Sequence, residues 1–276
     1  MSTLKSFPDG HYYSPINSIS DINTATLQKN KSITLQTLPS LNLDQNKFKE
    51  NIEKLGEISL RTKIKFPGKK GGEYYYYYRN DFYSYTDALV LSAFIEYLNP
   101  NKIIEIGSGF SSAVMHDVIT YLNLNTTCYH IEPYPDRLKS VINKPINIIE
   151  KRLQDVDLSL FRELQANDIL FIDSTHVAKA GSDVNYYISQ ILPVLNSGVY
   201  IHIHDIFWPF EYSEEWLKEG RSWNECYILR AFLQYNNAFS IEFFNHYMWL
   251  FYRELMTKFF PVGQKNYGGS IWLKKL

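Results

Sequence analysis

Two segments of the chain place acidic and histidine side chains directly after short apolar runs. FIDSTH supplies Asp173 and His176, and HIHD supplies His204 and Asp205. Carboxylates and imidazoles that meet in one cluster can transfer protons near neutral pH or bind a divalent cation. Both kinds of chemistry require the two apolar runs to be neighbouring parallel strands, because their carboxyl ends then meet at one edge of a sheet.

A third segment, KIIEIGSGFSS, runs from an apolar stretch through a glycine turn into a helical pattern. Gly107 and Gly109 permit backbone angles and close approaches that a Cβ atom would prevent. The helix that begins near Ser111 would offer unpaired N–H groups and partial positive charge to an anion. Glu105, within the preceding strand, either turns toward this site or is an edge-facing or helix-capping carboxylate. Such a turn also occurs without any ligand, so a second element must decide its meaning.

That second element is Glu132, which follows the next apolar stretch in the segment HIEPYP. A carboxylate at this place can accept hydrogen bonds from both hydroxyls of a ribose. NAD and S-adenosylmethionine both carry such a ribose. A pyrophosphate site favours glycine or alanine where this chain has Ser112, whereas a methionine carboxylate and amino group suit the hydroxyls of Ser108, Ser111 and Ser112. The pattern therefore favours S-adenosylmethionine.

A parallel α/β sheet would bring these residues together. Short apolar stretches predict strands at 103–106, 128–132, 146–150, 169–173 and 199–204. Helical patterns separate these strands, and the alternation is typical of βαβ units with right-handed crossovers. After residue 205 come an aromatic loop and a helix. Two late strands at 239–244 and 269–274 then predict an antiparallel hairpin.

The N-terminal part of the chain lacks this alternation. Residues 1–45 show little periodicity, and we interpret them as an irregular arm over the fold. Apolar residues at helical spacing predict helices at 45–60 and 86–98. Five consecutive tyrosines at 74–78 suit a strand, with a role at a sheet edge or in a homodimer.

Composition excludes several classes of protein. The chain has 276 residues with 28 Lys+Arg against 29 Asp+Glu, so it lacks the basic excess of a nucleic-acid binder. It has no apolar run of the roughly 18 residues that a membrane helix needs. The N-terminal MSTLKSFPDG lacks the apolar region of a secretory signal. We therefore expect a cytoplasmic protein without a nucleic-acid or membrane partner.

The sequence EIGSG, followed by Glu132 at the end of the next strand, is similar to the pattern of class I S-adenosylmethionine-dependent methyltransferases. More narrowly, the chain resembles a bacterial, uncharacterised subgroup similar to methyltransferase domain 24. The resemblance extends over nearly the whole chain, through DGHYYSP (9–15), EIGSGFSSAVM (105–115), ILFIDSTHVAKAGSDVN (169–185), HIHDIFWPFEY (202–212), WNECYILRAFL (223–233) and GSIWLKK (269–275).

The resemblance implies an α/β fold with a Rossmann-like seven-stranded sheet of order 3-2-1-4-5-7-6. The last strand would be antiparallel, and helices would flank the sheet. An N-terminal arm and a helical or strand-containing cap would occupy residues 1–100. The S-adenosylmethionine-binding core would occupy residues 101–276.

The resemblance also implies roles for individual residues. Glu132 would bind the ribose hydroxyls, and Gln154 and Asp155 would lie near the adenine. The residues expected at the cofactor are Glu105, Gly107, Ser108, Gly109, Ser111, Glu132, Gln154, Asp155 and Asp173. The acceptor would be a small molecule, methylated on a hydroxyl oxygen in preference to nitrogen. The residues expected on the acceptor side, as catalytic groups, are Asp173, His176, His204 and Asp205.

The acidic and histidine cluster leaves alternatives open. Asp173 and Asp205 would either hold Mg²⁺ against the oxygen atoms of the acceptor, or Asp173 would face the transferring methyl group without a metal. His176 and His204 are alternative general bases, and each would otherwise make a scaffold hydrogen bond. An NAD-dependent oxidoreductase and a non-catalytic S-adenosylmethionine-binding protein remain the competing functions.

Overall fold

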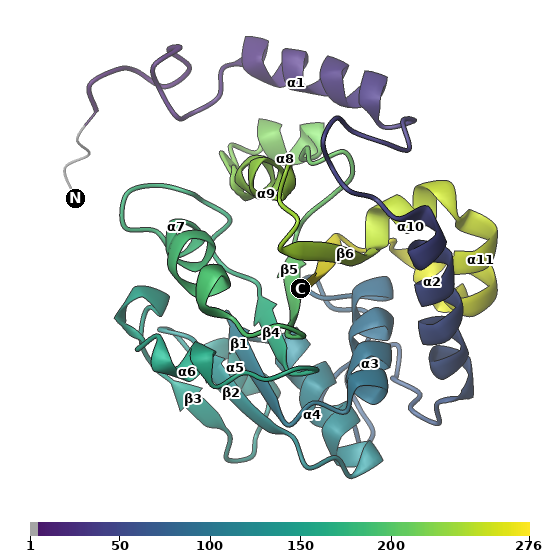
Figure 1. The fold of residues 1–276 in the computed structure, drawn as a ribbon. Helices are drawn as coiled ribbons and strands as arrows, with labels where there is room; N and C mark the ends of the chain where they lie inside the picture. The colour runs from purple at the N-terminus through teal and green to yellow at the C-terminus, as the bar shows by residue number, and fades with distance from the viewer. Residues whose placement is uncertain (1–4) are drawn as a thin grey trace.

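A mixed sheet of seven strands organises the chain, and its order is β3-β2-β1-β4-β5-β7-β6 (Figure 1). This arrangement comes from a computed structural model, which describes residues 5–276. The strands are β1 (Lys102–Ile106), β2 (Thr127–Ile131), β3 (Asn147–Ile149), β4 (Ile169–Ile172), β5 (Tyr200–His204), β6 (Phe239–Phe244) and β7 (Ser270–Lys275). The predicted fold class and strand order are confirmed.

The central strands are parallel, and their continuous apolar sequences are those expected of strands covered by helices on both faces. Strands β1, β2, β3, β4 and β5 pair in parallel, and β4 is buried along its whole length. A strand that is covered on both faces reads as a continuous apolar run, as ILFI does in β4. β7 pairs antiparallel with both β5 and β6. The parallel register places the ends of β1, β2, β4 and β5 at one edge of the sheet.

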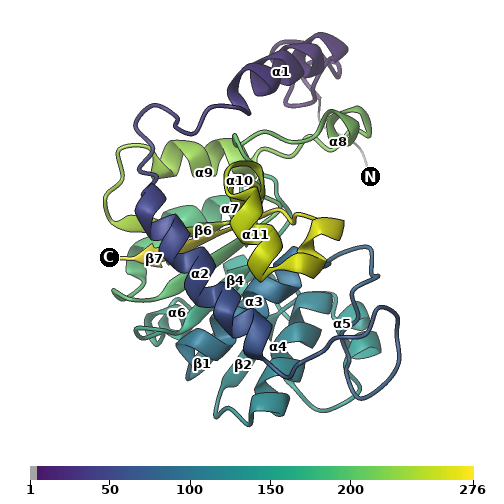
Figure 2. The ribbon, with the colours of Figure 1, turned by 90° about the vertical axis from the view of Figure 1, so that its right-hand side faces the viewer.

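Helices cover both faces of the sheet. The α-helices are α1 (Ile19–Ser32), α2 (Gln45–Arg61), α3 (Thr86–Leu98), α4 (Phe110–Leu122), α5 (Asp136–Val141), α6 (Ser159–Arg162), α7 (Asp183–Tyr186), α8 (Glu214–Lys218), α9 (Glu225–Leu233), α10 (Asn245–Phe251) and α11 (Arg253–Phe259). Figure 2 shows α2, α3 and α11 on the face turned toward the viewer, whereas Figure 1 shows α6 and α7 on the other side. Short turns of 3-10 or π helix are η1 (Leu153–Asp155), η2 (Tyr187–Ile191), η3 (Leu192–Val194) and η4 (Pro261–Lys265).

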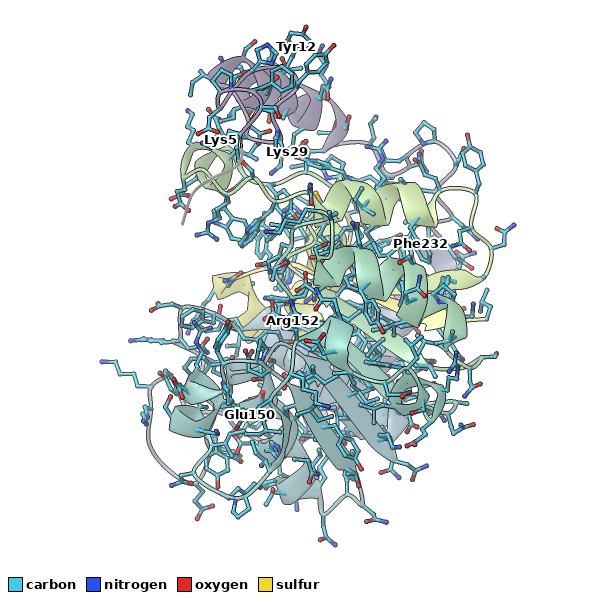
Figure 3. The ribbon with its side chains drawn as sticks, turned by 90° about the vertical axis from the view of Figure 1, so that its left-hand side faces the viewer. Lys5, Tyr12, Lys29, Glu150, Arg152 and Phe232 are labelled. Carbon is cyan, nitrogen blue, oxygen red and sulfur yellow. The ribbon has the colours of Figure 1, made fainter. Side chains whose placement is uncertain are left out.

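The N-terminal segment contains a helix that the sequence analysis missed. α1 lies within residues 1–45, which we interpreted as an irregular arm; residues 1–4 lie outside the described residues. Ser18 and Asp21 form a capping box at its start, with each side chain accepting from the other residue's backbone N–H. The sequence contains this capping box, but apolar residues recur only weakly at helical spacing in α1. Of the residues of α1, only Ile22 is buried. Figure 2 shows α1 beside α8, set apart from the sheet, and Figure 3 labels Tyr12 at its outer end.

Two further expectations were wrong. The tyrosine run at 74–78 forms no strand; instead the backbone N–H groups of Tyr75 and Tyr76 donate to the Asp117 carboxylate at 3.1 and 2.8 Å. A side-chain acceptor on α4 thus replaces the neighbouring strand. The late strands β6 and β7 do pair antiparallel as predicted, but the expected hairpin connection was wrong, because α10, α11 and η4 connect them. Among the described residues, no helix has the length and apolar character needed to cross a membrane.

Candidate active site

A cavity of about 560 Å³ opens at the edge of the sheet where β1, β2, β4 and β5 end. It gathers most of the predicted site residues. Those that line it are Gly107, Ser108, Gly109, Ser111, Glu132, Asp173, His176, His204 and Asp205. Three predicted residues, Glu105, Gln154 and Asp155, do not line it. The glycine turn and the acidic and histidine cluster therefore share one space.

The glycine turn lies directly against the end of β4. Gly107 has a φ of +76°, and a Cβ atom there would lie 1.8 Å from the backbone oxygen of Asp173. Packing against protein therefore requires this glycine, independently of any ligand. The next residue, Ser108, has a buried hydroxyl oxygen without a hydrogen-bond partner among residues 5–276. An unsatisfied hydroxyl on a cavity wall fits a polar ligand group.

Glu132 is half-buried beside this turn. Burial raises the pKa of its carboxyl group, while hydrogen bonds from the backbone N–H groups of Tyr134 and Ser108 oppose that shift. The Tyr134 bond measures 2.9 Å. A carboxylate has about four acceptor positions, so two remain for the hydroxyls of a ribose. Its predicted position at the cavity is thus compatible with the predicted role.

Glu105 lies behind the turn and not on the cavity wall. Its side chain is fully buried, and it accepts hydrogen bonds from the hydroxyls of Ser111 at 2.6 Å and Ser112 at 2.5 Å. The Nδ1 atom of His130 donates to the same carboxylate, and His130 Nε2 shares a 3.0 Å hydrogen bond with His116 Nε2. Glu105 therefore does not turn toward the cavity; it binds side chains in the first turn of α4 and does not cap a backbone N–H there. It stabilises the first turn of α4 instead of contacting the cavity.

Gln154 and Asp155 also lie away from the cavity. The Gln154 amide donates to the backbone oxygen of Gly181 at 2.6 Å. Asp155 accepts from Arg152 at 2.8 and 3.1 Å, and this exposed hydrogen-bonded pair holds the pKa of Asp155 below its ordinary value. Figure 3 shows Arg152 on the surface of the core. The structure therefore does not bring these two residues to the other predicted cofactor residues.

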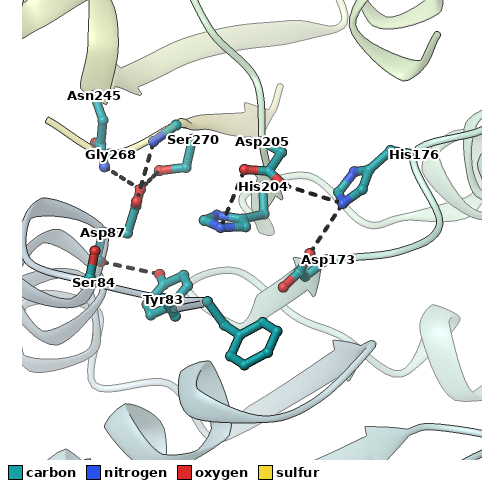
Figure 4. Close-up of polar contacts among 12 residues, drawn as sticks. Tyr83, Ser84, Asp87, Asp173, His176, His204, Asp205, Asn245, Gly268 and Ser270 are labelled. Carbon is teal, nitrogen blue, oxygen red and sulfur yellow. Dashed lines mark hydrogen bonds and ion pairs between the residues drawn. The ribbon is translucent and has the colours of Figure 1, made fainter. Parts of the chain in front are cut away.

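The acidic and histidine cluster forms as predicted at the ends of β4 and β5. His176 Nε2 lies 3.5 Å from an oxygen of Asp173 and 3.5 Å from an oxygen of Asp205 (Figure 4). His204 Nε2 lies 3.7 Å from the other oxygen of Asp205. His176 has a φ of +60°, in the left-handed region, where the chain bends back toward the cavity. Neighbouring parallel strands explain why residues 32 positions apart meet.

Glu225 completes the cluster, and the sequence analysis missed it. Its buried carboxylate accepts from His176 Nδ1 at 2.7 Å and from the Tyr187 hydroxyl at 2.7 Å. The backbone N–H groups of Asn224 and Glu225 donate to the backbone oxygen of His176 at 3.0 and 3.2 Å. The start of α9 thereby holds both the backbone and the ring of His176. The segment WNECYIL has the pattern of an ordinary helix start, so its sequence did not indicate a role for Glu225 at the site.

The surrounding charges set the ionisation of the cluster. Burial alone would lower the pKa of His176, but hydrogen bonds to Asp173 and Glu225 raise it well above its ordinary value. Burial alone would raise the pKa of Asp173, but the neighbouring His204 and His176 lower it to about 2. At neutral pH, His176 is therefore an imidazolium ion and Asp173 a carboxylate. Both nitrogens of His176 act as donors, which excludes it as a proton acceptor in this state.

The remaining histidines of β5 differ from each other. His204 lines the cavity, its ring centroid lies 5.0 Å from that of Tyr83, and its buried Nδ1 has no hydrogen-bond partner among residues 5–276. Burial opposes ionisation of His204, but Asp205 and Asp173 raise its pKa. His202 is a core residue stacked on Phe171 with centroids 4.0 Å apart, and burial lowers its pKa well below the ordinary value. His202 also has unpartnered ring nitrogens, but it does not line the cavity. Of the two cavity histidines, His204 is the one with a ring nitrogen that has no partner among residues 5–276.

A buried carboxylate on α3, that of Asp87, helps to hold the strand that carries His204 in place. Asp87 accepts from the Asn245 amide at 2.8 Å and the Ser270 hydroxyl at 2.7 Å (Figure 4). The Tyr83 hydroxyl donates to the backbone oxygen of Asp87 at 3.1 Å. Asp87 thereby joins α3 to the start of β7, which pairs with β5. His204 sits opposite Ser270 in that pairing.

The predicted Mg²⁺ site does not fit this arrangement. The Nε2–H of His176 occupies the point between the Asp173 and Asp205 carboxylates where a cation would have to bind. Within residues 5–276, no group of three or more His, Cys, Asp or Glu side chains is arranged to hold a metal ion. A divalent cation needs several oxygen ligands in its first shell. The His176 ring already lies within 3.5 Å of both carboxylates and leaves no shared space for a cation between them.

Aromatic and arginine side chains form the outer wall of the cavity. The residues concerned are Phe82, Phe110, Arg137, Trp216, Arg221 and Trp223. Of the aromatic loop at 207–216, only Trp216 reaches the cavity, whereas Trp208, Phe210 and Tyr212 are buried in the core. Sequence position alone did not distinguish the wall from the core, because the whole loop is rich in aromatic residues.

Comparisons with known proteins agree with this site. The model of a family described as a methyltransferase domain matches residues 104–206, which contain the glycine turn, Glu132, and Asp173, His176, His204 and Asp205, but not Glu225. An uncharacterized protein from Archaeoglobus fulgidus is 33% identical over 170 residues, which are 60% of this chain and 76% of that protein. Residues 104–206 therefore match a methyltransferase domain, and the sheet order is that of the class I methyltransferase fold.

Two solved structures are similar at low identity. The methyltransferase PaMTH1 of Podospora anserina with bound SAH is 12% identical, with a TM-score of 0.43 and all of both chains covered. The plantazolicin methyltransferase BpumL, in complex with SAH and a triazolic desmethylPZN analog, is 14% identical, with a TM-score of 0.45. That comparison covers 67% of this chain and 83% of the other.

Proposed function

We propose that this methyltransferase transfers a methyl group from S-adenosylmethionine to a hydroxyl of a small-molecule acceptor. One observation carries the proposal: a single cavity is lined both by the donor residues, Ser108 and Glu132, and by the cluster of Asp173 and His204. A donor and an acceptor bound in one enclosed space can react in line, and positioning is the main contribution that a protein makes to such a transfer.

The donor side would be formed by Glu132 and Ser108. The free acceptor positions of Glu132 would bind the ribose hydroxyls, and the unpartnered Ser108 hydroxyl would bind the polar methionine end. S-adenosylmethionine bound there would supply an electrophilic methyl group. Gly107 keeps this donor side against β4, so that the donor and Asp173 are neighbours.

The acceptor side would be formed by Asp173, His176, His204 and Asp205. The acceptor hydroxyl would donate its one hydrogen bond to His204, its oxygen would bond to the methyl carbon as the carbon–sulfur bond breaks, and S-adenosylhomocysteine would leave. The Asp173 carboxylate would stabilise the positive charge that His204 gains. His204 would take the proton, because its Nδ1 has no other partner and His176 is protonated on both nitrogens. The reaction should therefore accelerate as pH rises through the pKa of His204, which lies above its ordinary value. No step of this proposal uses a metal.

Binding of the donor is tested with S-adenosylhomocysteine in isothermal titration calorimetry, with NAD as the competing ligand. Glu132→Ala should weaken binding about 10–100-fold, which corresponds to the loss of one or two hydrogen bonds to a charged group. Glu150→Ala is the matched control, because Glu150 is exposed after the next strand, β3. Binding of NAD in preference to S-adenosylhomocysteine would contradict the proposal.

Transfer is tested with methyl-labelled S-adenosylmethionine and a panel of hydroxylated small molecules, each paired with its O-methylated form and with an amine analogue. We expect label in some hydroxyl compounds and in none of their O-methylated partners. Label in amines alone would contradict the hydroxyl assignment. Each assay is run with Mg²⁺ and with EDTA, and a rate that requires Mg²⁺ would overturn the proposed metal-free arrangement.

A further inference from the structure

We propose that the acceptor is a hydroxy acid whose carboxylate binds Arg221 on the outer wall of the cavity. The inference rests on the proposed function, because it names the class of molecule that the cluster methylates. Arg221 follows α8 and lines the same cavity as Asp173 and His176.

The Arg221 side chain is held in one position. Its Nε donates to Glu219 at 2.8 Å, and its guanidinium carbon lies 4.5 Å from the ring centroid of Trp216 and 5.1 Å from that of Trp223. The two indole rings are edge to face, with centroids 5.2 Å apart. A guanidinium group beside two aromatic rings gains cation–π attraction and loses little further freedom when it binds an anion.

Most of its hydrogen-bonding capacity is unused. A guanidinium group has five N–H donors in a planar fork. Among residues 5–276, the side chain of Arg221 donates only through Nε, so the four donors on its terminal nitrogens have no protein partner. The side chain remains 37% exposed. Two parallel N–H groups of such a fork match the two oxygens of a carboxylate.

The position of Arg221 also separates the two ends of an acceptor. The Trp223 ring lies 4.4 Å from the ring of His176, so Arg221 and His176 both contact Trp223. The carboxylates of Asp173 and Asp205 would repel an anionic group at the cluster. An acceptor with an acid at one end and a hydroxyl at the other would thus bind in one orientation, with its hydroxyl at the cluster.

The test uses matched acid and amide pairs: 4-hydroxybenzoate, 4-hydroxyphenylacetate and 4-hydroxycinnamate, each with its uncharged primary amide. Affinities for the protein saturated with S-adenosylhomocysteine are measured by calorimetry. We expect at least one acid to bind about 10–100-fold more tightly than its amide, as a charge-assisted bidentate contact would give. Arg221→Gln should abolish this preference, and Arg221→Lys should retain part of it. Arg253→Gln, at an exposed arginine on α11, should leave it unchanged.

Every other outcome overturns the proposal. Equal affinity for all three acids and their amides would mean that the cavity does not select an anion. A preference that survives in Arg221→Gln would assign the anion to another residue. If Arg221→Gln weakens S-adenosylhomocysteine binding tenfold or more, Arg221 holds the carboxylate of the donor instead. Failure of the unmodified protein to bind S-adenosylhomocysteine would refute the proposed function itself, which these variants do not test.

Discussion

Glu105 and Glu225 are both fully buried, and each accepts a hydrogen bond from the Nδ1 atom of a histidine. Glu105 pairs with His130 and also binds two serine hydroxyls of α4. Glu225 pairs with His176 and also binds the Tyr187 hydroxyl. The local chemistry of the two clusters is therefore nearly the same.

The clusters differ in what lies beyond the histidine. The second ring nitrogen of His130 shares a hydrogen bond with another histidine, His116, so the Glu105 cluster ends inside the protein. His176 directs its second nitrogen to Asp173 and Asp205 on the cavity wall. A buried carboxylate thus stabilises a turn in one place and sets the charge of a reactive group in the other. The direction of the histidine ring, and not the residue types, decides between these roles.

The largest effect is expected for Asp173→Asn, which removes charge from the cavity cluster alone. Loss of the carboxylate that stabilises protonated His204 should lower the rate of methyl transfer about 10³-fold. S-adenosylhomocysteine affinity, measured by calorimetry, should stay near that of the unmodified protein. Asp157→Asn, at an exposed residue, is the control. A large loss of S-adenosylhomocysteine affinity would place Asp173 on the donor side.

Glu105→Ala should act on stability. The change leaves the Ser111 and Ser112 hydroxyls and His130 without their buried acceptor, so the free energy of unfolding should fall by about 3 kcal/mol. Urea denaturation measures this, with Glu105→Gln as a milder variant. The control is Glu163→Ala, which removes an exposed ion pair with Lys102 and should cost no more than about 1 kcal/mol. Equal losses in the two alanine variants would show that Glu105 is not a structural brace.

Glu225→Gln should affect catalysis, in contrast to the stability effect of the change at Glu105. Loss of the charge that holds His176 should slow methyl transfer about 10–100-fold, by analogy with other residues that orient a reactive group. The pKa of His176, measured by ¹⁵N NMR, should fall, because hydrogen bonds to Glu225 and Asp173 raise it. Glu254→Gln on α11 is an exposed control. An unchanged His176 pKa would show that Glu225 does not set the charge of His176.

The smallest effect is expected for His116, which is hydrogen-bonded to His130 in the Glu105 cluster. Burial lowers the pKa of His116 to about 3 in the folded protein. Between pH 6.5 and 3 the unfolded chain binds a proton there that the folded chain does not, so this group makes stability fall as pH falls. His116→Gln should therefore reduce the stability lost between pH 7 and 5 by about 1–2 kcal/mol in urea denaturation. An unchanged pH dependence would mean that His116 titrates normally.

The sequence was sufficient for the parts of this architecture that depend on neighbouring residues. Apolar runs located the strands, and the ends of adjacent parallel strands placed Asp173 and Asp205 at one cavity. It was insufficient where distant segments meet. Glu225 is 49 residues from His176, and the turn after α8 that carries Arg221 has no motif. Which way Glu105 points depends on the rotation of β1 against α4, and local sequence does not encode that rotation.

The contact of Gly107 with the backbone of Asp173 has a consequence for how molecules reach the cavity. A Cβ atom at position 107 would clash with the Asp173 backbone oxygen, and the Asp173 N–H donates to the backbone oxygen of Ile106 at 2.8 Å, so the turn after β1 and the end of β4 are joined directly. The inner half of the cavity is in this sense a rigid floor. We therefore expect substrate entry and product release on the opposite side, where Phe82 and Trp223 lie in connecting segments and Trp216 lies in the short helix α8.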